Sequence, residues 1–397
     1  MNNFKLTNNA AIRIKELQKN EEIGSLFRIS VLGGGCSGFQ YDFSFTKKIN
    51  DDDITFCDFD VNYLIDKTSI EFIKEGSLDF VEELGGSFFK IENPNSTANC
   101  GCGTSFSIWF KMYISSFNVN SINARINNLI DYLNNHPIDV ILLQEIKSVE
   151  ENFPYKTFED LGYNIYANCQ KSYNGVAVLS KFEMTNPKFS FFEDTQARFL
   201  EVDILDYKII CVYVPNGNPV DTEKYTYKLN WLENFYSYCK SLVKTNKKII
   251  IGGDFNIIQS NLDCYNEDDW TDDALFTIEV KKKLRQILHL GFHDSFRAKN
   301  SSKKAFSYWD YQNGAWQKDN GIRIDLILLT SHVIDELKNS GIHKEVRGQT
   351  KPSDHTPVWI ELWYLGYKYL FFGLNALRSL FLGLWTQTLP LGCIPAP

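Results

Sequence analysis

At 397 residues, the chain is longer than a single hydrophobic core usually grows, so its length predicts more than one domain. Hydrophobic residues make up 44% of it and charged residues 23%, which excludes a chain that is disordered throughout. The formal net charge of -8 argues against a polyanionic partner, but the charge is uneven. Residues 1–108 hold 10 Lys and Arg against 16 Asp and Glu, whereas the remainder holds 31 against 33, so a nucleic-acid partner stays open for the second part.

The N-terminal segment predicts a short amphipathic helix, with no apolar run long enough for a secretory signal. Thr7 or Asn8 would cap this helix, and four apolar residues would face inward: Ala11, Ile12, Ile14 and Leu17. Short alternating segments follow, among them 26–32 and 54–61, separated by turn residues. Residues 1–108 are therefore predicted to form a small, mostly β (α+β) domain.

Three cysteines of this first part stand beside glycines. Cys36 lies in GGGCSGFQY, and Cys100 and Cys102 lie in NPNSTANCGCGTSFSI. Residues two apart in an extended chain project to one side, so Cys100 and Cys102 can both face a soft metal. Three thiolates are one fewer than the usual four ligands, so a second subunit or a small thiol would complete the site. Zinc, or spare thiols without a metal, are the physical alternatives.

These segments, together with LIDKTSIEFI and GSLDFVEELGGSFFKIENPN, resemble the A-type iron-sulfur carrier and assembly family over about residues 4–108. The resemblance implies a 2Fe-2S or 4Fe-4S cluster, held by Cys36, Cys100 and Cys102 across a homodimer and passed to iron-sulfur apo-proteins. In the free-standing family the CGCG segment lies near the chain end, whereas here it runs directly into another domain, which would hinder cluster binding.

The other six cysteines are interpreted as ordinary thiols: Cys57, Cys169, Cys211, Cys239, Cys264 and Cys393. An odd total of nine at irregular spacings favours a reducing compartment over a disulfide framework, which predicts the cytoplasm.

From Met112 the pattern changes to strands alternating with helices. A strand is predicted at 113–117, a helix at 122–134, and further strands at 140–144, 175–179, 208–213, 248–252 and 324–329. Residues 112–362 are therefore predicted to form an α/β sandwich with buried sheets. Met112 is also a candidate internal start, so a natural fusion and two merged reading frames both stay open.

The last segment, 363–397, begins with an apolar run. Residues 363–384 are almost long enough to cross a bilayer but contain Lys368 and Arg378. A membrane anchor, an amphipathic surface helix and an accidental extension are the alternatives. The closing TQTLPLGCIPAP is predicted to be disordered.

Polar residues stand at the ends or starts of the predicted strands in the second part: Asn118, Glu145, Tyr213, Asp254, Asn256, Asp325, Asp354 and His355. Hydrolysis of a phosphodiester needs a metal ion, a positioned water and a group that stabilises the leaving oxygen. Mg²⁺ favours isolated carboxylates of this kind over a Cys/His cage. Each residue alone is a weak signal, because Asp and Asn commonly end strands as turn formers. Together and in this order, they predict a magnesium phosphoesterase site.

This series resembles the endonuclease/exonuclease/phosphatase superfamily over residues 112–362. The resemblance implies a two-sheet α/β sandwich with the site at the ends of the sheets. Glu145 would bind Mg²⁺, or Mn²⁺ as an alternative, assisted by Asn118 and by Asp325 or Asp354.

The resemblance also implies roles for the remaining residues of the series. Asp254 would orient or deprotonate the attacking water, and Asn256 would steady the phosphate. His355, held by Asp354, would contact the phosphate oxygen and stabilise its developing charge.

Two further segments resemble the exonuclease III type of abasic-site endonuclease. Tyr213 and Asn216 lie in CVYVPNG, and FSYWDYQNGAWQKDNGIRIDLILL resembles the abasic-pocket region, where Trp309 would stack against an extruded sugar. Arg198, in QARFLE, is a candidate phosphate contact or a solvated surface charge. Core packing is the alternative for Tyr213 and Trp309.

The resemblance implies cleavage of double-stranded DNA 5′ to an abasic site, with 3′-to-5′ exonuclease and 3′-phosphatase activities at 3′ ends. One alternative is a small-molecule phosphatase of the same superfamily. Another is an iron-sulfur carrier in which the nuclease is a passenger.

Overall fold

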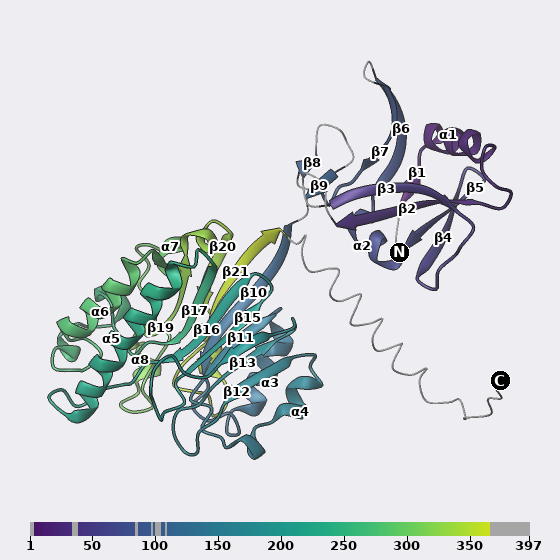
Figure 1. The fold of residues 1–397 in the computed structure, drawn as a ribbon. Helices are drawn as coiled ribbons and strands as arrows, with labels where there is room; N and C mark the ends of the chain where they lie inside the picture. The colour runs from purple at the N-terminus through teal and green to yellow at the C-terminus, as the bar shows by residue number, and fades with distance from the viewer. Residues whose placement is uncertain are drawn as a thin grey trace, which may run out of the picture. The chain divides into compact units, whose positions relative to one another are not determined.

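The computed structural model describes residues 4–33, 39–83, 86–96, 98–99, 105–107 and 109–365. The chain divides into two compact units, one of residues 1–110 and 364–397 and the other of residues 111–363 (Figure 1). Cys36, Cys100 and Cys102, as well as Cys393 and the tail from residue 366, lie outside the described residues. Among the helices that are described, none has the length and apolar character to cross a membrane.

The first unit begins with the predicted capped helix, α1 (Asn8–Gln18). The hydroxyl of Thr7 accepts a hydrogen bond from the backbone N–H of Ala10, which confirms Thr7 as the cap. Ala11 and Ile14 are buried, but Ile12 is 51% exposed, so its predicted inward position is wrong. Consecutive helix positions lie about 100° apart, which places Ile12 about 200° away from Ile14.

The other described residues of the first unit are mostly β, as predicted, with one further helix, α2 (Lys67–Ile73). A six-stranded sheet has the order β4-β5-β2-β3-β9-β8, and a three-stranded sheet has the order β1-β6-β7. The strands are β1 (Lys5–Leu6), β2 (Leu26–Gly33), β3 (Phe39–Thr46), β4 (Asp53–Asp58), β5 (Val61–Asp66), β6 (Ser77–Glu83), β7 (Gly86–Glu92), β8 (Ala98–Asn99) and β9 (Ser105–Ser107). Stacked aromatic rings fill the core, such as Tyr41 and Phe106 with centroids 4.3 Å apart.

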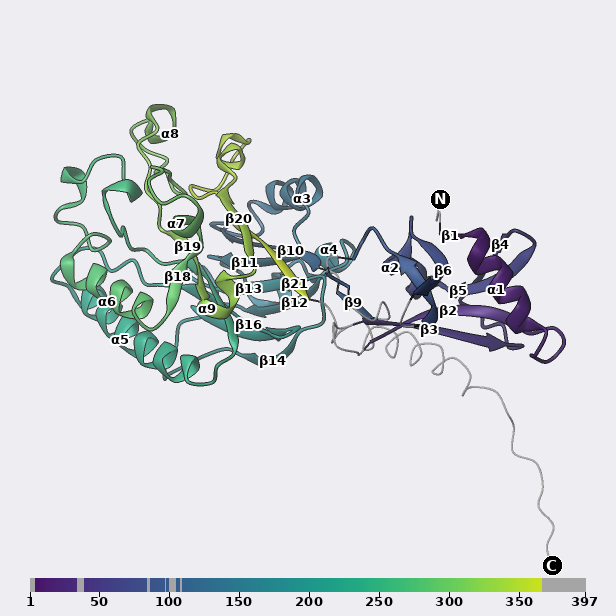
Figure 2. The same cartoon turned by 90° about the horizontal axis from the view of Figure 1, so that it is seen from above.

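The second unit is a two-sheet α/β sandwich, which confirms the predicted fold class (Figures 1 and 2). One sheet has the order β12-β13-β11-β10-β21-β20. Its strands are β10 (Trp109–Asn118), β11 (Val140–Gln144), β12 (Asn164–Asn168), β13 (Val176–Ser180), β20 (Leu337–Ile342) and β21 (Val358–Leu365). The other sheet has the order β14-β15-β16-β17-β19-β18. Its strands are β14 (Thr185–Lys188), β15 (Phe199–Ile204), β16 (Tyr207–Tyr213), β17 (Lys248–Asp254), β18 (Phe292–Asp294) and β19 (Asp325–Thr330).

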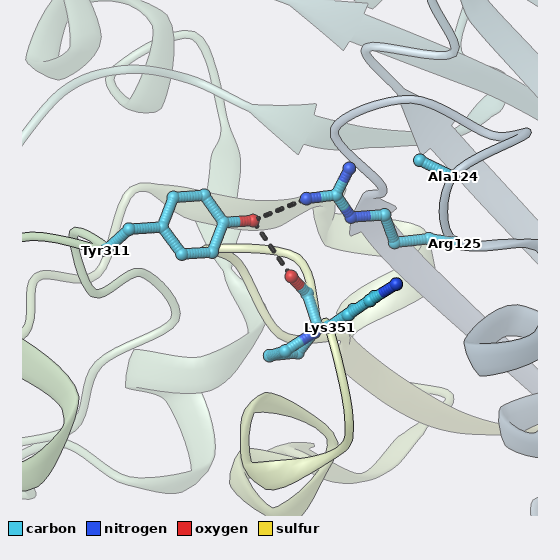
Figure 3. A pocket seen from close by; sticks show the side chains of 5 residues that line it. Ala124, Arg125, Tyr311 and Lys351 are labelled. Atoms are coloured by element: carbon cyan, nitrogen blue, oxygen red, sulfur yellow. Dashed lines mark hydrogen bonds between the residues drawn. The ribbon is translucent and has the colours of Figure 1, made fainter.

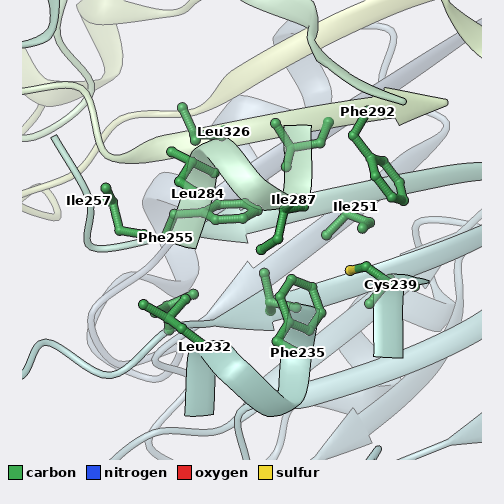
Figure 4. Packing of buried hydrophobic residues seen from close by; sticks show 14 of the residues in the cluster. Leu232, Phe235, Cys239, Ile251, Phe255, Ile257, Leu284, Ile287, Phe292 and Leu326 are labelled. Carbon is green, nitrogen blue, oxygen red and sulfur yellow. The ribbon is translucent and has the colours of Figure 1, made fainter. Parts of the chain in front are cut away.

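Helices cover the outer faces of both sheets. α3 (Ile126–Asn135) and α4 (Tyr155–Glu159) cover the sheet that contains β11, and α5 (Glu223–Val243) and α6 (Ile278–Leu288) cover the other (Figure 2). Buried positions of α5 recur with helical spacing, and its Phe235 and Cys239 pack against Ile251 of β17 (Figure 4). Three short helices complete the unit: α7 (Ser295–Lys299), α8 (Ala315–Lys318) and α9 (Ser331–Ile334).

Two consecutive glycines stand near the end of β17, in which residues 249–254 are all buried. A Cβ atom on Gly252 would lie 2.5 Å from a methyl carbon of Leu142 in the facing sheet. A Cβ atom on Gly253 would lie 1.9 Å from the carbonyl oxygen of Val212 on the neighbouring strand. Both positions therefore exclude a side chain, immediately before Asp254.

Candidate active site and similarity to known proteins

The strand register brings the predicted polar residues to the same end of the sandwich. Asn118 ends β10 and pairs with Gln144, so Glu145 follows directly beside it. In the other sheet Tyr213 pairs with Asp254, and Asp254 pairs with Asp325. Residues far apart in the chain thus meet because the ends of β10, β16 and β17 and the start of the antiparallel β19 lie at one end of the sandwich.

Asn118 connects the two sheets at this end. Its buried amide donates hydrogen bonds to Oε1 of Glu145 at 2.8 Å and to Oδ2 of Asp254 at 3.0 Å. The Tyr213 hydroxyl also donates to Oε1 of Glu145, at 2.9 Å. Burial, together with the Glu145 and Asp254 carboxylates, raises the pKa of Tyr213 well above its ordinary value. Tyr213 is therefore a neutral hydrogen-bond donor in this arrangement.

Glu145 has an ion-pair partner that the sequence analysis missed. Nζ of Lys147 lies 2.7 Å from Oε2 of Glu145 and 2.7 Å from Oδ1 of Asn120. Burial raises the pKa of Glu145, but Lys147 and Asn118 outweigh that effect, so the carboxyl stays ionised with a lowered pKa. Both Glu145 and Lys147 have positive φ, at 51° and 49°, and this turn brings the two side chains together.

His355 is hydrogen-bonded to Asp325. The sequence analysis expected Asp354 as its partner, and that expectation is wrong. Nδ1 of His355 lies 2.9 Å from Oδ2 of Asp325, and its Nε2 lies 3.7 Å from Oδ2 of Asp254. Burial lowers the pKa of His355, but the Asp325 and Asp254 carboxylates raise it to about 10 overall. The imidazole is consequently a cation at neutral pH.

Asp354 belongs to the rim of this cluster. Its Oδ1 accepts hydrogen bonds from Nδ2 of Asn120 at 3.0 Å and from the Ser353 hydroxyl at 3.3 Å. Sequence adjacency suggested Asp354 as the partner of His355, whereas consecutive residues of an extended chain point to opposite sides.

Asp254 lies between the two sheets with its pKa raised to about 7. Burial is the main cause, the Asp325 and Glu145 carboxylates add to it, and the His355 charge opposes it. The backbone N–H of Asn256 donates to Oδ1 of Asp254 at 2.9 Å. Asn216 is exposed and its amide donates to Oδ1 of Asn256 at 3.3 Å.

Trp309 does not face the site, so its predicted stacking on an extruded sugar is wrong. The indole is completely buried, and its Nε1 donates to Oδ1 of Asp319 at 3.0 Å. The preceding residue, Tyr308, points to the opposite side, where its ring centroid lies 4.9 Å from that of His355. Arg198 is half-buried and packs over the Tyr213 ring, with 4.6 Å to the centroid, so it supports that tyrosine.

The cluster suits a divalent cation that prefers oxygen ligands. Glu145 and Asp254 offer carboxylate oxygens as ligand atoms, and these lie within 4.8 Å of each other and of a ring nitrogen of His355, which as an imidazolium contributes charge and not a ligand. Oδ1 of Asp325 is buried without a hydrogen-bond partner, although a buried carboxylate oxygen is normally satisfied. Three neighbouring carboxylates against one imidazolium and one ammonium leave negative charge that a cation would neutralise.

A hollow with two basic residues borders the rim of the cluster. It is lined by Ala124, Arg125, Tyr311, Lys351 and Pro352 (Figure 3). Arg125 donates to the Tyr311 hydroxyl at 3.0 Å, and the hydroxyl donates to the Pro352 carbonyl at 2.9 Å. Arg125 also donates to the carbonyl oxygen of Asn120 at 2.8 Å, which connects the hollow to the Lys147–Glu145 pair.

Residues 115–355 match the endonuclease/exonuclease/phosphatase family. The chain belongs to this family. Exodeoxyribonuclease III of Haemophilus influenzae is 33% identical over 265 residues, which cover 63% of this chain and 99% of that protein. The nucleases of this family use divalent metals, and the second unit is a nuclease of the exonuclease III type.

Solved structures of this family have the same fold as the second unit. An AP endonuclease from Archaeoglobus fulgidus is 30% identical with a TM-score of 0.61, covering 63% of this chain and 98% of that one. The 3′ phosphatase NExo from Neisseria, bound to a product DNA hairpin, is 30% identical with a TM-score of 0.62, covering 63% and 99%.

The first part of the chain has relatives of its own. Residues 2–104 match the iron-sulphur cluster biosynthesis family. The iron-sulfur cluster insertion protein ErpA of Acinetobacter baumannii is 47% identical over 104 residues, which cover 26% of this chain and 94% of that protein. The chain therefore also belongs to this second family, whose members bind iron-sulfur clusters.

Proposed function

We propose that residues 112–362 form a Mg²⁺-dependent DNA-repair phosphodiesterase that cleaves 5′ to abasic sites and degrades DNA from 3′ ends. The observation that supports this proposal best is the meeting of Glu145, Asp254 and His355 from both sheets within 4.8 Å. Its substrate class is supported by the similarity to exodeoxyribonuclease III and to the AP endonuclease structure.

The metal ion would be held by Glu145, with Asn118 and Asp325 as further ligands. When bound, Mg²⁺ supplies positive charge that neutralises the scissile phosphate, and Mn²⁺ would replace it. The unpartnered Oδ1 of Asp325 and the ionised Glu145 support this ligand set. Asp354 would act from the rim, through Asn120, and not as a direct ligand.

Asp254 is the base for the attacking water in this proposal. A general base works best when its pKa is close to the working pH, and the pKa of Asp254 is about 7. Asn256, whose backbone N–H holds Oδ1 of Asp254, keeps the carboxylate oriented. The Asn256 side chain donates to the Val214 carbonyl at 3.0 Å. Its amide nitrogen therefore stabilises the segment after β16, in addition to any contact that the side chain makes with the phosphate.

His355 and Tyr213 stabilise negative charge on the phosphate. The hydrogen bond to Asp325 fixes the orientation of the His355 ring, and the protonated ring is a charged hydrogen-bond donor. Tyr213 acts as a neutral donor, because its pKa is raised far above the working range. Arg198, packed on the Tyr213 ring, positions that tyrosine.

Two places next to the cluster would contact the DNA. Arg125 and Lys351 in the hollow would contact backbone phosphates, and the exposed Asn216 would contact DNA from the other sheet. Tyr308 takes over the role first given to Trp309, since it lies beside His355 and packs against the apolar pair Ile322 and Ile324. An extruded abasic sugar would be received there.

The test is cleavage of an end-labelled duplex that contains one abasic site, in Mg²⁺, by the full chain. We expect a single cut immediately 5′ to the abasic site, which is lost in the variant Asp254→Asn. The exposed Asp268→Asn is the matched control. Removal of 3′ phosphates without any internal cut would contradict the abasic-site proposal and indicate a 3′ phosphatase. Hydrolysis of an inositol phosphate with no DNA cleavage would indicate a small-molecule phosphatase.

For residues 1–108 we propose a carrier function in a reducing compartment, the cytoplasm, with Cys36, Cys100 and Cys102 holding an iron-sulfur cluster across a homodimer. The similarity to ErpA supports it. Anaerobic reconstitution should give a visible cluster band that disappears when the three cysteines are replaced by Ser. An unchanged band would contradict the ligand assignment. If a chain with Asp254→Asn, which should lack nuclease activity, still delivers its iron-sulfur cluster to an apo-protein, the carrier function does not depend on the nuclease activity.

A further inference from the structure

Two histidines and a glutamate gather on the second unit, away from the residues of the phosphodiesterase cluster. His136 follows the end of α3, and His343 and Glu345 lie at the start of a short 3-10 helix, η4 (Lys344–Gly348). One ring nitrogen of each histidine and one carboxylate oxygen lie within 4.8 Å of one another. Nε2 of His136 is 3.9 Å from Oε1 of Glu345.

A buried chain of hydrogen bonds fixes the tautomer of His343. The Ser115 hydroxyl donates its only hydrogen to the Val358 carbonyl at 3.0 Å, so it accepts from the Tyr132 hydroxyl at 3.0 Å. The Tyr132 oxygen, with its hydrogen used, must then accept from Nδ1 of His343 at 3.1 Å. Nδ1 of His343 therefore carries the hydrogen, and the free lone pair of the ring is on Nε2.

This arrangement is the support that a metal-binding histidine usually has. Such a ring commonly donates its other N–H to a fixed acceptor, which orients the ring and makes the ligand nitrogen more basic. The His343 ring is further held between His136 and Trp359, with centroid distances of 4.0 Å and 5.3 Å. Tyr132 is 1% exposed, so the acceptor itself cannot move away.

We propose that His136, His343 and Glu345 form a second metal site, which takes a divalent transition metal of the Zn²⁺ type. Two imidazoles and one carboxylate suit Zn²⁺, whereas Mg²⁺ prefers oxygen ligands only. This proposal is independent of the proposed phosphodiesterase function, because the two clusters share no residue.

The distances define what binding requires. Zinc bonds of about 2.0–2.2 Å set neighbouring tetrahedral ligands about 3.3–3.6 Å apart, somewhat closer than the separations of up to 4.8 Å found here. The two rings lie 25° from parallel, so one of them must turn for both lone pairs to meet at the ion. His136 is the ring that turns, since His343 is held by Tyr132, and the exposed Glu345 side chain moves with it. Water would take the fourth position.

A metal at this place would fasten α3 to the segment that leads into the catalytic loop. Arg347, in the same 3-10 helix, donates to the Trp309 carbonyl at 3.1 Å, and Ser353 and His355 follow in the chain. The bound ion would thus restrain η4 on one side, while Arg347 restrains it on the other.

The experiment is calorimetric titration with ZnCl₂ of the full chain in excess Mg²⁺, with Cys36, Cys100 and Cys102 replaced by Ser. Those replacements remove the thiolates with known affinity for zinc, and Mg²⁺ competes for the oxygen-rich cluster. We expect a zinc-binding event that His136→Ala and Glu345→Gln each weaken by at least about tenfold. Both residues are partly exposed, so neither variant threatens the fold.

Two controls separate this site from the others. His289→Ala removes an exposed histidine outside the cluster and should leave the zinc affinity unchanged. Asp254→Asn alters the phosphodiesterase cluster and should also leave it unchanged. Equal zinc affinity in the starting chain, in His136→Ala and in Glu345→Gln would overturn the proposal, whatever the nuclease activity of those variants.

Discussion

Two buried aspartates of the second unit show opposite electrostatic behaviour. Asp263 is completely buried, and its carboxylate accepts from Arg323, Arg297 and the Ser260 hydroxyl. Burial raises its pKa, but the two guanidinium groups outweigh this and leave the pKa below the ordinary value. Asp254 is almost as buried, yet its pKa is raised to about 7 beside Asp325 and Glu145.

The difference is one of charge balance. Arg323 also donates to Asp294 at 2.8 Å, so the Asp263 cluster supplies two cations for two carboxylates and is balanced in charge within the fold. The Asp254 cluster has three carboxylates against Lys147 and His355. A buried cluster whose charges cancel stabilises the fold, whereas a buried cluster with net negative charge is suited to binding a metal cation and to catalysis.

The largest expected effect is on catalysis by the unbalanced cluster. Asp254→Asn should lower kcat/KM on an abasic duplex by about 10²–10⁴-fold, because it removes the base near the attacking water. The thermal midpoint should not fall, since the raised pKa means that the charged form is disfavoured in the fold. Asp268→Asn, at an exposed position, is the control. Activity within tenfold of the parent would show that Asp254 is not the base.

The balanced cluster should respond in stability instead. Asp263→Asn leaves Arg323 and Arg297 short of a counter-charge, and breaking a buried pair costs about 3–5 kcal/mol. Urea unfolding of the second unit measures this loss, with Asp268→Asn again as the control. A loss below about 1 kcal/mol would remove the contrast between the two clusters.

Tyr213→Phe tests whether a neutral phenol contributes to the reaction. Loss of one preorganised donor should lower kcat by about 10²-fold with little change in folding. Because the pKa of Tyr213 is far above its ordinary value, the parent should show no alkaline rise in rate up to pH 9. A rise that Tyr213→Phe abolishes would instead identify the phenolate as the acting form.

The smallest expected effect is a pH dependence of stability without metal. His355 has a pKa of about 10 in the folded chain and 6.5 as its ordinary value, so its stabilisation is complete below pH 6.5 and disappears as pH rises through 10. The opposing cost of ionising Asp254 develops between pH 3.8 and about 7, so it is complete at pH 7. Burial lowers the pKa of Lys228 from 10.5 to about 7, so this lysine adds stability as pH rises from 7 to 10, and only the difference between the parent and a His355 variant isolates His355.

We therefore expect the difference in unfolding free energy between the parent and His355→Gln, measured in EDTA, to move against the parent as pH rises from 7 to 10. The exposed His289→Gln should behave as the parent. A parallel decrease in all three proteins would mean that His355 is not held as a cation.

Much of the fold could be predicted from local patterns, but not all of it. β11 (Val140–Gln144) was located to the residue because a run of apolar, β-branched residues is buried on both faces of a sheet. α5 (Glu223–Val243) was not predicted. Its aromatic residues surround the helix, and its buried face contains Lys228, so the apolar periodicity is blurred.

The candidate site shows the same limit at the scale of single residues. Strand ends and starts indicated which polar residues would meet, because the last residues of parallel strands and the first residue of an antiparallel neighbour lie at the same edge of a sheet. The partner of His355 could not be predicted, since it is set by strand pairing that puts Asp325 nearby and not by the adjacent Asp354. Tyr308 and Trp309 are adjacent in the chain, so their side chains point to opposite sides. The backbone β-bridges of Tyr308 with Ile322 and His355 determine that Tyr308, and not Trp309, faces the site.

Gly252 of β17 controls how closely the two sheets pack, and that distance affects the active site. Asn118 and Glu145 belong to one sheet and Tyr213 and Asp254 to the other, so the gap between the layers sets how near the two groups stand. A single methyl group at Gly252 would meet Leu142 and push these layers apart. Such a change would touch no reacting atom, yet it would lengthen every polar contact that spans the interior.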